Sequence, residues 1–110
     1  MKVAVIGSRS FASYPLEEVI PPDATEIISG GARGVDTLAR EYARAHGIPC
    51  TEILPDYTRY GKGAPLRRNL DIIARAELVI ALWDGQSTGT AYVVNQCKKL
   101  GKPFILVTVT

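Results

Sequence analysis

The stretch from residue 27 to residue 36, Ile-Ile-Ser-Gly-Gly-Ala-Arg-Gly-Val-Asp, decides how the rest of the chain is interpreted. A short apolar run stops in glycines, and a helical pattern follows. A strand that leads through glycines into a helix can hold phosphate, because backbone N–H groups and the positive helix end approach an anion closely. Arg33 adds a planar guanidinium. The same glycines also suit an ordinary tight turn, so this stretch alone leaves both interpretations open.

Composition and length describe one small domain. The chain has 110 residues, of which 46% are hydrophobic, and a net charge of +2. These values predict a single domain over residues 1–110, and the charge is too small to indicate nucleic-acid binding by itself. Cys50 and Cys97 have no metal-like spacing, which favours free thiols in a reducing compartment. The apolar runs are shorter than a signal peptide or membrane span requires, so we expect a soluble, cytoplasmic protein.

Strands and helices are expected to alternate along the chain. Continuous apolar runs predict strands at 3–6, 25–29, within 48–54, at 78–82 and at 104–109. Helical spacing of apolar residues predicts helices over 11–20, from 35, from 66 and from about 88. Glycine and proline punctuate residues 55–65, which are expected to form a long loop. Its aromatic and basic side chains either cover a ligand or simply cross the surface.

The helix after this loop begins with an unusual group of polar residues. Arg67, Arg68 and Asn69 are expected in its first turn, where cations oppose the helix dipole. This placement indicates an anionic ligand for one of the arginines. The alternative is pairing with Asp71 or Glu77.

The alternation predicts an open, mainly parallel five-stranded α/β sheet with helices on both faces. With the strand order 3-2-1-4-5, the order reverses between the first and fourth strands, and such folds bind ligands at that point. The loops that start at Gly7 and Trp83 would flank this crevice, and the loop at Gly30 would lie beside it. Three converging loops rich in Gly, Ser, Thr and Arg favour a phosphate-bearing ligand.

Four motifs carry a resemblance to a known group of proteins. In order, they are residues 7–9 (Gly-Ser-Arg), 29–36, 68–69 (Arg-Asn) and 87–91 (Ser-Thr-Gly-Thr-Ala). They resemble the motifs of the SLOG superfamily of Rossmann-like nucleotide-binding domains. The nearest members are the small YspA/YpsA-related proteins (DUF2493) and the core of the DNA-processing protein DprA. The similarity covers nearly the whole chain.

This resemblance implies a Rossmann-like domain that binds a nucleotide or nucleotide derivative as a sensor, carrier or accessory module. The sequence contains no metal-binding cluster, so we expect that no cofactor is required and that magnesium is needed only with a polyphosphate ligand. The resemblance makes a homodimer plausible. Asp36 is either a family acid or a helix-start residue, and Trp83 either supports a base or packs at the end of the sheet. The candidate ligand-binding residues are Gly7, Ser8, Arg9, Ser29, Gly30, Gly31, Arg33, Gly34, Asp36, Arg68, Asn69, Trp83, Ser87, Thr88, Gly89 and Thr90.

A glycosidase is the first alternative. The LOG branch of the superfamily cleaves the N-glycosidic bond of nucleoside monophosphates with a Pro-Gly-Gly-x-Gly-Thr-x-x-Glu segment and an Arg-Lys pair. Gly89 and Thr90 match that pattern, but Val93 stands at the glutamate position and Asn69 at the lysine position. Valine can neither activate water nor stabilise positive charge on a sugar, which argues against an enzyme. The replacement carboxylates to consider are Asp36, Asp56 and Asp84.

Single-stranded DNA binding, as in DprA, is the second alternative. Basic residues lie next to two tyrosines, a combination that single strands favour. These residues are Tyr57, Arg59, Tyr60, Lys62, Arg67 and Arg68.

Overall fold

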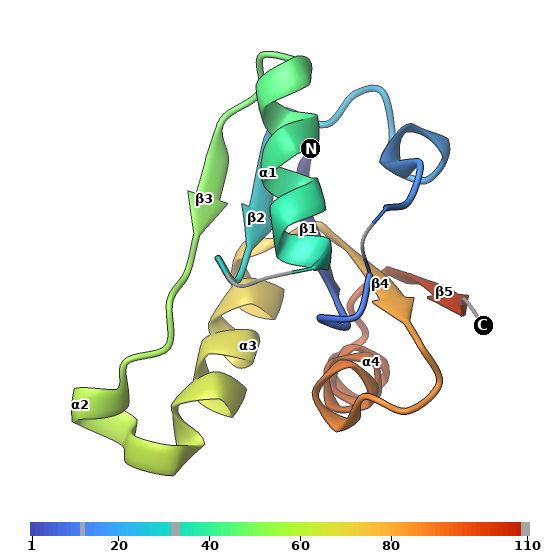
Figure 1. Ribbon diagram of the computed structural model, residues 1–110. Coiled ribbons are helices and arrows are strands. Elements are labelled where there is room, and N and C mark those ends of the chain that lie inside the picture. Colours follow the sequence, from blue (N-terminus) through green and yellow to red (C-terminus); the bar gives the residue numbers. More distant parts are fainter. Residues whose placement is uncertain (12, 32–33, 109–110) are drawn as a thin grey trace.

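The sheet has the predicted topology. The computed structural model describes residues 1–11, 13–31 and 34–108. Its strands are β1 (Lys2–Gly7), β2 (Glu26–Ser29), β3 (Cys50–Glu52), β4 (Leu78–Trp83) and β5 (Phe104–Thr108). They form one parallel sheet in the order β3-β2-β1-β4-β5, which confirms the predicted fold class (Figure 1). Gly7 pairs with Leu82, so β1 and β4 end at the same edge of the sheet.

Helices cover the two faces of the sheet separately (Figure 1). Helix α1 (Val35–Ala45) lies on one face, and α3 (Ala64–Arg75) and α4 (Thr88–Leu100) lie on the other. Side chains that alternate along β1 belong to different cores: Val3 and Val5 pack on the α1 side, and Ala4 and Ile6 on the α3–α4 side. This explains why the central strands are apolar without interruption. None of the helices in the described part of the chain is long and apolar enough to cross a membrane.

The segment 11–20, which was expected to carry a short helix, contains less helix than the sequence predicted. The described part of this segment has only one short 3-10 helix, η1 (Leu16–Glu18). Residues that precede a proline disfavour the helical conformation, so Pro15 and Pro21 leave room for little more than one turn. Leu16 and Ile20 are buried and fix the segment against the α1 side of the sheet.

The predicted loop over residues 55–65 is also wrong. It contains α2 (Tyr57–Tyr60) and the 3-10 helix η2 (Gly61–Gly63), and α3 begins within it, at Ala64. The Asp56 carboxylate caps α2 by accepting a hydrogen bond of 3.1 Å from the Arg59 N–H. Since α3 begins earlier than expected, Arg68 and Asn69 lie in its second turn.

Candidate functional site

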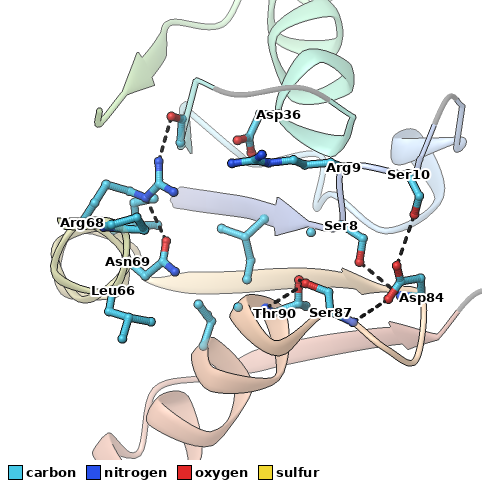
Figure 2. Close-up of a pocket in the computed structure, with 17 residues that line it drawn as sticks. Ser8, Arg9, Ser10, Asp36, Leu66, Arg68, Asn69, Asp84, Ser87 and Thr90 are labelled. Atoms are coloured by element: carbon cyan, nitrogen blue, oxygen red, sulfur yellow. Dashed lines mark hydrogen bonds between the residues drawn. The ribbon is translucent and has the colours of Figure 1, made fainter. Parts of the chain in front are cut away.

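A cavity of about 410 Å³ lies where the order of the strands reverses (Figure 2). Its walls come from the loop after β1, from Gly30 after β2, from Asp36 on α1, from the first half of α3 and from the β4–α4 connection. The sequence predicted a crevice here between the loops that follow β1 and β4. Open α/β sheets bind ligands at this position because neighbouring connections leave the sheet on opposite faces.

The cavity brings together most of the predicted site residues. Those that line it are Gly7, Ser8, Arg9, Gly30, Asp36, Arg68, Asn69, Ser87, Gly89 and Thr90. Ser29, Gly31, Gly34, Trp83 and Thr88 are not among the lining residues. Arg33 lies outside the residues that the structure describes.

Several lining residues were missing from the sequence-based set. Ile6, Ile72 and Val93 form an apolar part of the lining, and Pro65, Leu66, Ser10 and Asp84 add to the walls. Helical spacing could have identified two of them. Ile72 follows Arg68 by four residues and Val93 follows Gly89 by four, so each pair shares one face of its helix.

Arg68 fastens α3 to the glycine loop. Its Nη1 donates hydrogen bonds to the carbonyl oxygens of Gly30 (2.9 Å) and Ile53 (3.4 Å), and its Nε donates to Asn69 Oδ1 (2.9 Å). Burial lowers the pKa of Arg68, and nearby Asp36 opposes that shift. The guanidinium nevertheless stays charged at neutral pH. Its Nη2 forms no hydrogen bond to the described residues, which leaves donors for a ligand.

Asp84 organises the β4–α4 connection and ties it to the loop after β1 (Figure 2). One carboxylate oxygen accepts from the N–H groups of Gln86 (2.9 Å) and Ser87 (2.8 Å), and the other accepts from Ser10 Oγ (3.2 Å). The Asp84 N–H donates to Ser8 Oγ (3.3 Å). The two backbone hydrogen bonds are the main reason why the pKa of Asp84 is lowered. This carboxylate is therefore an acceptor at neutral pH.

The start of α4 faces the cavity with its positive end. Ser87 caps the helix, because its Oγ accepts a hydrogen bond from the Thr90 N–H (3.4 Å). Trp83 Nε1 donates to the Ser87 carbonyl oxygen (2.9 Å), so the indole holds this turn in place. Within the described residues, the N–H groups of Thr88 and Gly89 have no partner. A 13-residue helix with free N–H groups at its start is suited to bind an anion.

Most of the glycines at the site serve close packing within the protein. A Cβ on Gly30 would lie 2.6 Å from Arg68 Nη1, one on Gly31 2.5 Å from Glu52 Oε2, and one on Gly34 2.6 Å from the Arg9 carbonyl oxygen. Gly89 differs, because nothing lies within 4 Å of its Cβ position. Open space beside a lining glycine is therefore found at the start of α4.

The carboxylates that could replace the missing LOG glutamate have different surroundings. Asp56 caps α2 and does not line the cavity. Asp84 lines it but is engaged in the hydrogen bonds described above, and Asp36 lines it while only 8% exposed. Val93, at the glutamate position, lines the cavity with 1% of its surface exposed.

Metal-binding groups are not gathered at this site. In the described ranges, no set of three His, Cys, Asp or Glu side chains is placed to hold a metal ion. Cys97 is buried, Cys50 is half-buried, and both are free thiols. Burial raises the pKa of each thiol.

Fold and cavity together define a Rossmann-like α/β domain with a polar cavity at the reversal of strand order. The chain belongs to the YspA, cpYpsA-related SLOG family, whose model matches residues 1–60. It is also 33% identical over 90 residues to the Gene 61 protein of Mycobacterium phage D29, over 76% of this chain and 72% of that protein. No solved structure matches the chain. The matched 60 residues include the loops at Gly7 and Gly30, whereas the lining residues from α3 and α4 follow them in the chain.

Proposed function

We propose that this protein binds a nucleotide or nucleotide derivative in the cavity between β1 and β4, as a sensor, carrier or accessory module. One observation carries the proposal: the same cavity combines an apolar lining with cationic side chains and the free N–H groups of a helix start. A nucleotide needs all three, because it joins a planar base, a sugar and a phosphate. Membership of a SLOG family supports a nucleotide-related role.

Each part of such a ligand has a fitting partner. The Gly89 N–H and the Nη2 of Arg68 suit phosphate oxygens, since both are donors with positive charge or positive helix potential. The Asp84 carboxylate suits sugar hydroxyls, because it accepts hydrogen bonds at neutral pH. Ile72 and Val93 offer apolar contact to a sugar or a base.

Glycosidase chemistry is less well supported by the same residues. A carboxylate that activates water works best with a pKa near the operating pH, and the lowered pKa of Asp84 makes it a weak base. Val93 contributes only an apolar surface. We therefore expect a bound nucleotide to be recovered intact.

The test is calorimetric titration with a panel of nucleoside mono- and diphosphates and cyclic nucleotides, followed by chromatography of the mixtures. Gly89→Leu places a side chain in the open space at the start of α4, and Gly63→Leu is the matched control. Gly63 also has nothing within 4 Å of its Cβ position, and it does not line the cavity. We expect Gly89→Leu to weaken binding by about 10- to 100-fold, the value of a lost hydrogen bond to a charged group.

Gly63→Leu should bind as the wild type does. Unchanged affinity in Gly89→Leu would contradict the proposed site, and no binding of any nucleotide by the wild type would contradict the proposed function. Release of free base would favour the LOG-like alternative.

A further inference from the structure

Arg9 is a cavity residue whose guanidinium is available to a ligand. It is exposed, and Figure 2 shows its side chain extending from the loop after β1 toward Asp36, away from Ser87 and Thr90. Within the described residues, neither a hydrogen bond nor a salt bridge engages this guanidinium. Arg9 therefore brings a positive charge and N–H donors to the cavity wall.

The guanidinium of Arg68 lies on the same wall of the cavity. Arg68 Nη1 and one carboxylate oxygen of Asp36 lie 2.6 Å and 3.0 Å from the point where a Cβ of Gly30 would stand, so both groups meet at the end of β2. Burial lowers the pKa of Arg68, and the like charge of Arg9 lowers it further, which means that the two guanidinium groups are within electrostatic reach of each other. Two arginines outnumber the single carboxylate here, and an anion that contacts both arginines would relieve their repulsion.

The free N–H groups at the start of α4 lie on the other side of β1. Strand β1 stands between β2 and β4, and α4 follows β4 whereas Gly30 follows β2. Neighbouring strands are about 4.8 Å apart, so the ends of β2 and β4 stand roughly 10 Å apart. Figure 2 accordingly shows Asp36 and Arg9 on one side of the cavity and Ser87 and Thr90 on the other. Because a hydrogen bond spans only about 2.9 Å, one phosphate group is too small to contact both places.

Apolar side chains form the cavity lining between these two cationic places. Ile6 stands near the end of β1 and therefore between them. Ile72 lies one helical turn after Arg68, and its side chain is apolar. Val93 lies one helical turn after Gly89 in the same way. A neutral part of a ligand, such as the carbon skeleton of a sugar, fits this lining better than a further charge does.

We infer that the nucleotide in this cavity carries two separate phosphate groups on opposite sides of its sugar, as in a nucleoside 3′,5′-bisphosphate. This inference rests on the proposed nucleotide binding. One phosphate contacts the N–H groups at the start of α4, and the other lies between Arg9 and Arg68, in a second phosphate site where planar guanidinium groups suit phosphate oxygens. A linear 5′-diphosphate holds both charges at one end of the sugar, so it would occupy only one of the two places. The cavity volume of about 410 Å³ is within the range of sites that bind small molecules.

The test compares three forms of each of the four common nucleosides in calorimetric titrations: the 5′-monophosphate, the 5′-diphosphate and the 3′,5′-bisphosphate. For the best-bound nucleoside, we expect the wild type to bind the bisphosphate about tenfold more tightly than the monophosphate, the gain from one charge-assisted contact. The diphosphate should gain much less, although it carries the same additional phosphate group. This comparison separates the position of the second phosphate from its charge.

Two variants locate the gain within the protein. Arg9→Gln removes one guanidinium from the second phosphate site, and we expect it to bind the bisphosphate and the monophosphate with equal affinity. Arg44→Gln is the matched control, because it removes the same group from the exposed last turn of α1, outside the cavity lining, and it should keep the tenfold gain. Circular dichroism of both variants verifies that the fold is kept.

The outcomes distinguish this inference from the function on which it rests. Equal affinity of the wild type for the bisphosphate and the monophosphate, or a diphosphate that binds as tightly as the bisphosphate, would overturn the second phosphate site and leave nucleotide binding intact. A gain that survives Arg9→Gln, or one that Arg44→Gln also loses, would do the same. A wild type that binds none of the three forms would overturn both the inference and the proposed function.

Discussion

At the scale of single residues, the glycines of the site have two different roles. Gly30 has a neighbour on the side where a side chain would project, because Arg68 crosses it to reach the Gly30 carbonyl oxygen. Gly89 has open space on that side and lines the cavity. Glycine at position 30 therefore serves packing. Glycine at position 89 keeps open space at the start of α4, and the stability of α4 itself does not require a glycine there.

Alanine substitutions should separate these two roles. Gly89→Ala is expected to raise the free energy of unfolding by roughly 0.5 kcal/mol, because alanine is the better helix former. Gly30→Ala is expected to lower it by about 1–3 kcal/mol, since Arg68 and the loop would have to move. Urea denaturation followed by circular dichroism measures both changes. A destabilised Gly89→Ala protein would mean that the space beside Gly89 is filled.

At the scale of elements, the β4–α4 connection depends on one carboxylate. Asp84 accepts three hydrogen bonds that join this connection to itself and to the loop after β1. Hydrogen bonds to the ionised form lower its pKa below the ordinary value of 3.8. The stability that Asp84 contributes is therefore present above that value and is lost as the pH falls through the lower pKa of the folded state.

Asp84→Asn should show this dependence directly. At neutral pH we expect the wild type to have the larger free energy of unfolding, because an amide replaces only part of the carboxylate's acceptor capacity. The difference should stay constant above about pH 5 and shrink as the pH falls below the ordinary carboxyl value. Denaturation at a series of pH values measures it. A difference that grows in acid would show that the pKa of Asp84 is raised.

The elements also show what could be predicted from the sequence and why. Unbroken apolar strands and glycine-ended helices carry strong local signals, so the order and type of the sheet were predicted correctly. Residues 55–65 were predicted as a loop because they contain glycine and proline, yet Asp56 caps a helical turn there and Pro65 sits in the first turn of α3, where proline is tolerated. The contacts of Arg68 with Gly30 and Ile53 join distant segments and leave no local signal.

At the scale of the whole molecule, the two edges of the described sheet differ. Edge strand β3 is three residues long and carries Glu52, which pairs with Arg40. Edge strand β5 has five residues without a charge, and Ile105 and Leu106 are 38% and 41% exposed. A long apolar edge strand offers unpaired backbone groups to another chain.

If the protein forms the homodimer that its resemblance made plausible, β5 is the expected contact. Leu106→Lys should then shift the protein from dimer to monomer in sedimentation equilibrium, because a charge on an edge strand opposes pairing. Leu54→Lys is the control, since Leu54 is 65% exposed but lies beside Gly31, away from β5. A wild type that stays monomeric at every concentration would contradict this prediction.

Ligand binding should also be visible in the stability of the entire domain. A ligand that binds only the folded state at a hundred times its dissociation constant stabilises it by about 2.7 kcal/mol. For a domain of this size, each kcal/mol raises the melting temperature by roughly 4 °C, so a shift of about 10 °C is expected. Trp83 is the only tryptophan in the sequence and contacts the start of α4 through Ser87, so its fluorescence follows the unfolding. The Gly89→Leu variant should have a normal melting temperature without nucleotide, because its fold is intact. Its melting temperature should rise little with nucleotide, because the leucine side chain fills the anion site. A rise equal to that of the wild type would place the ligand elsewhere on the molecule.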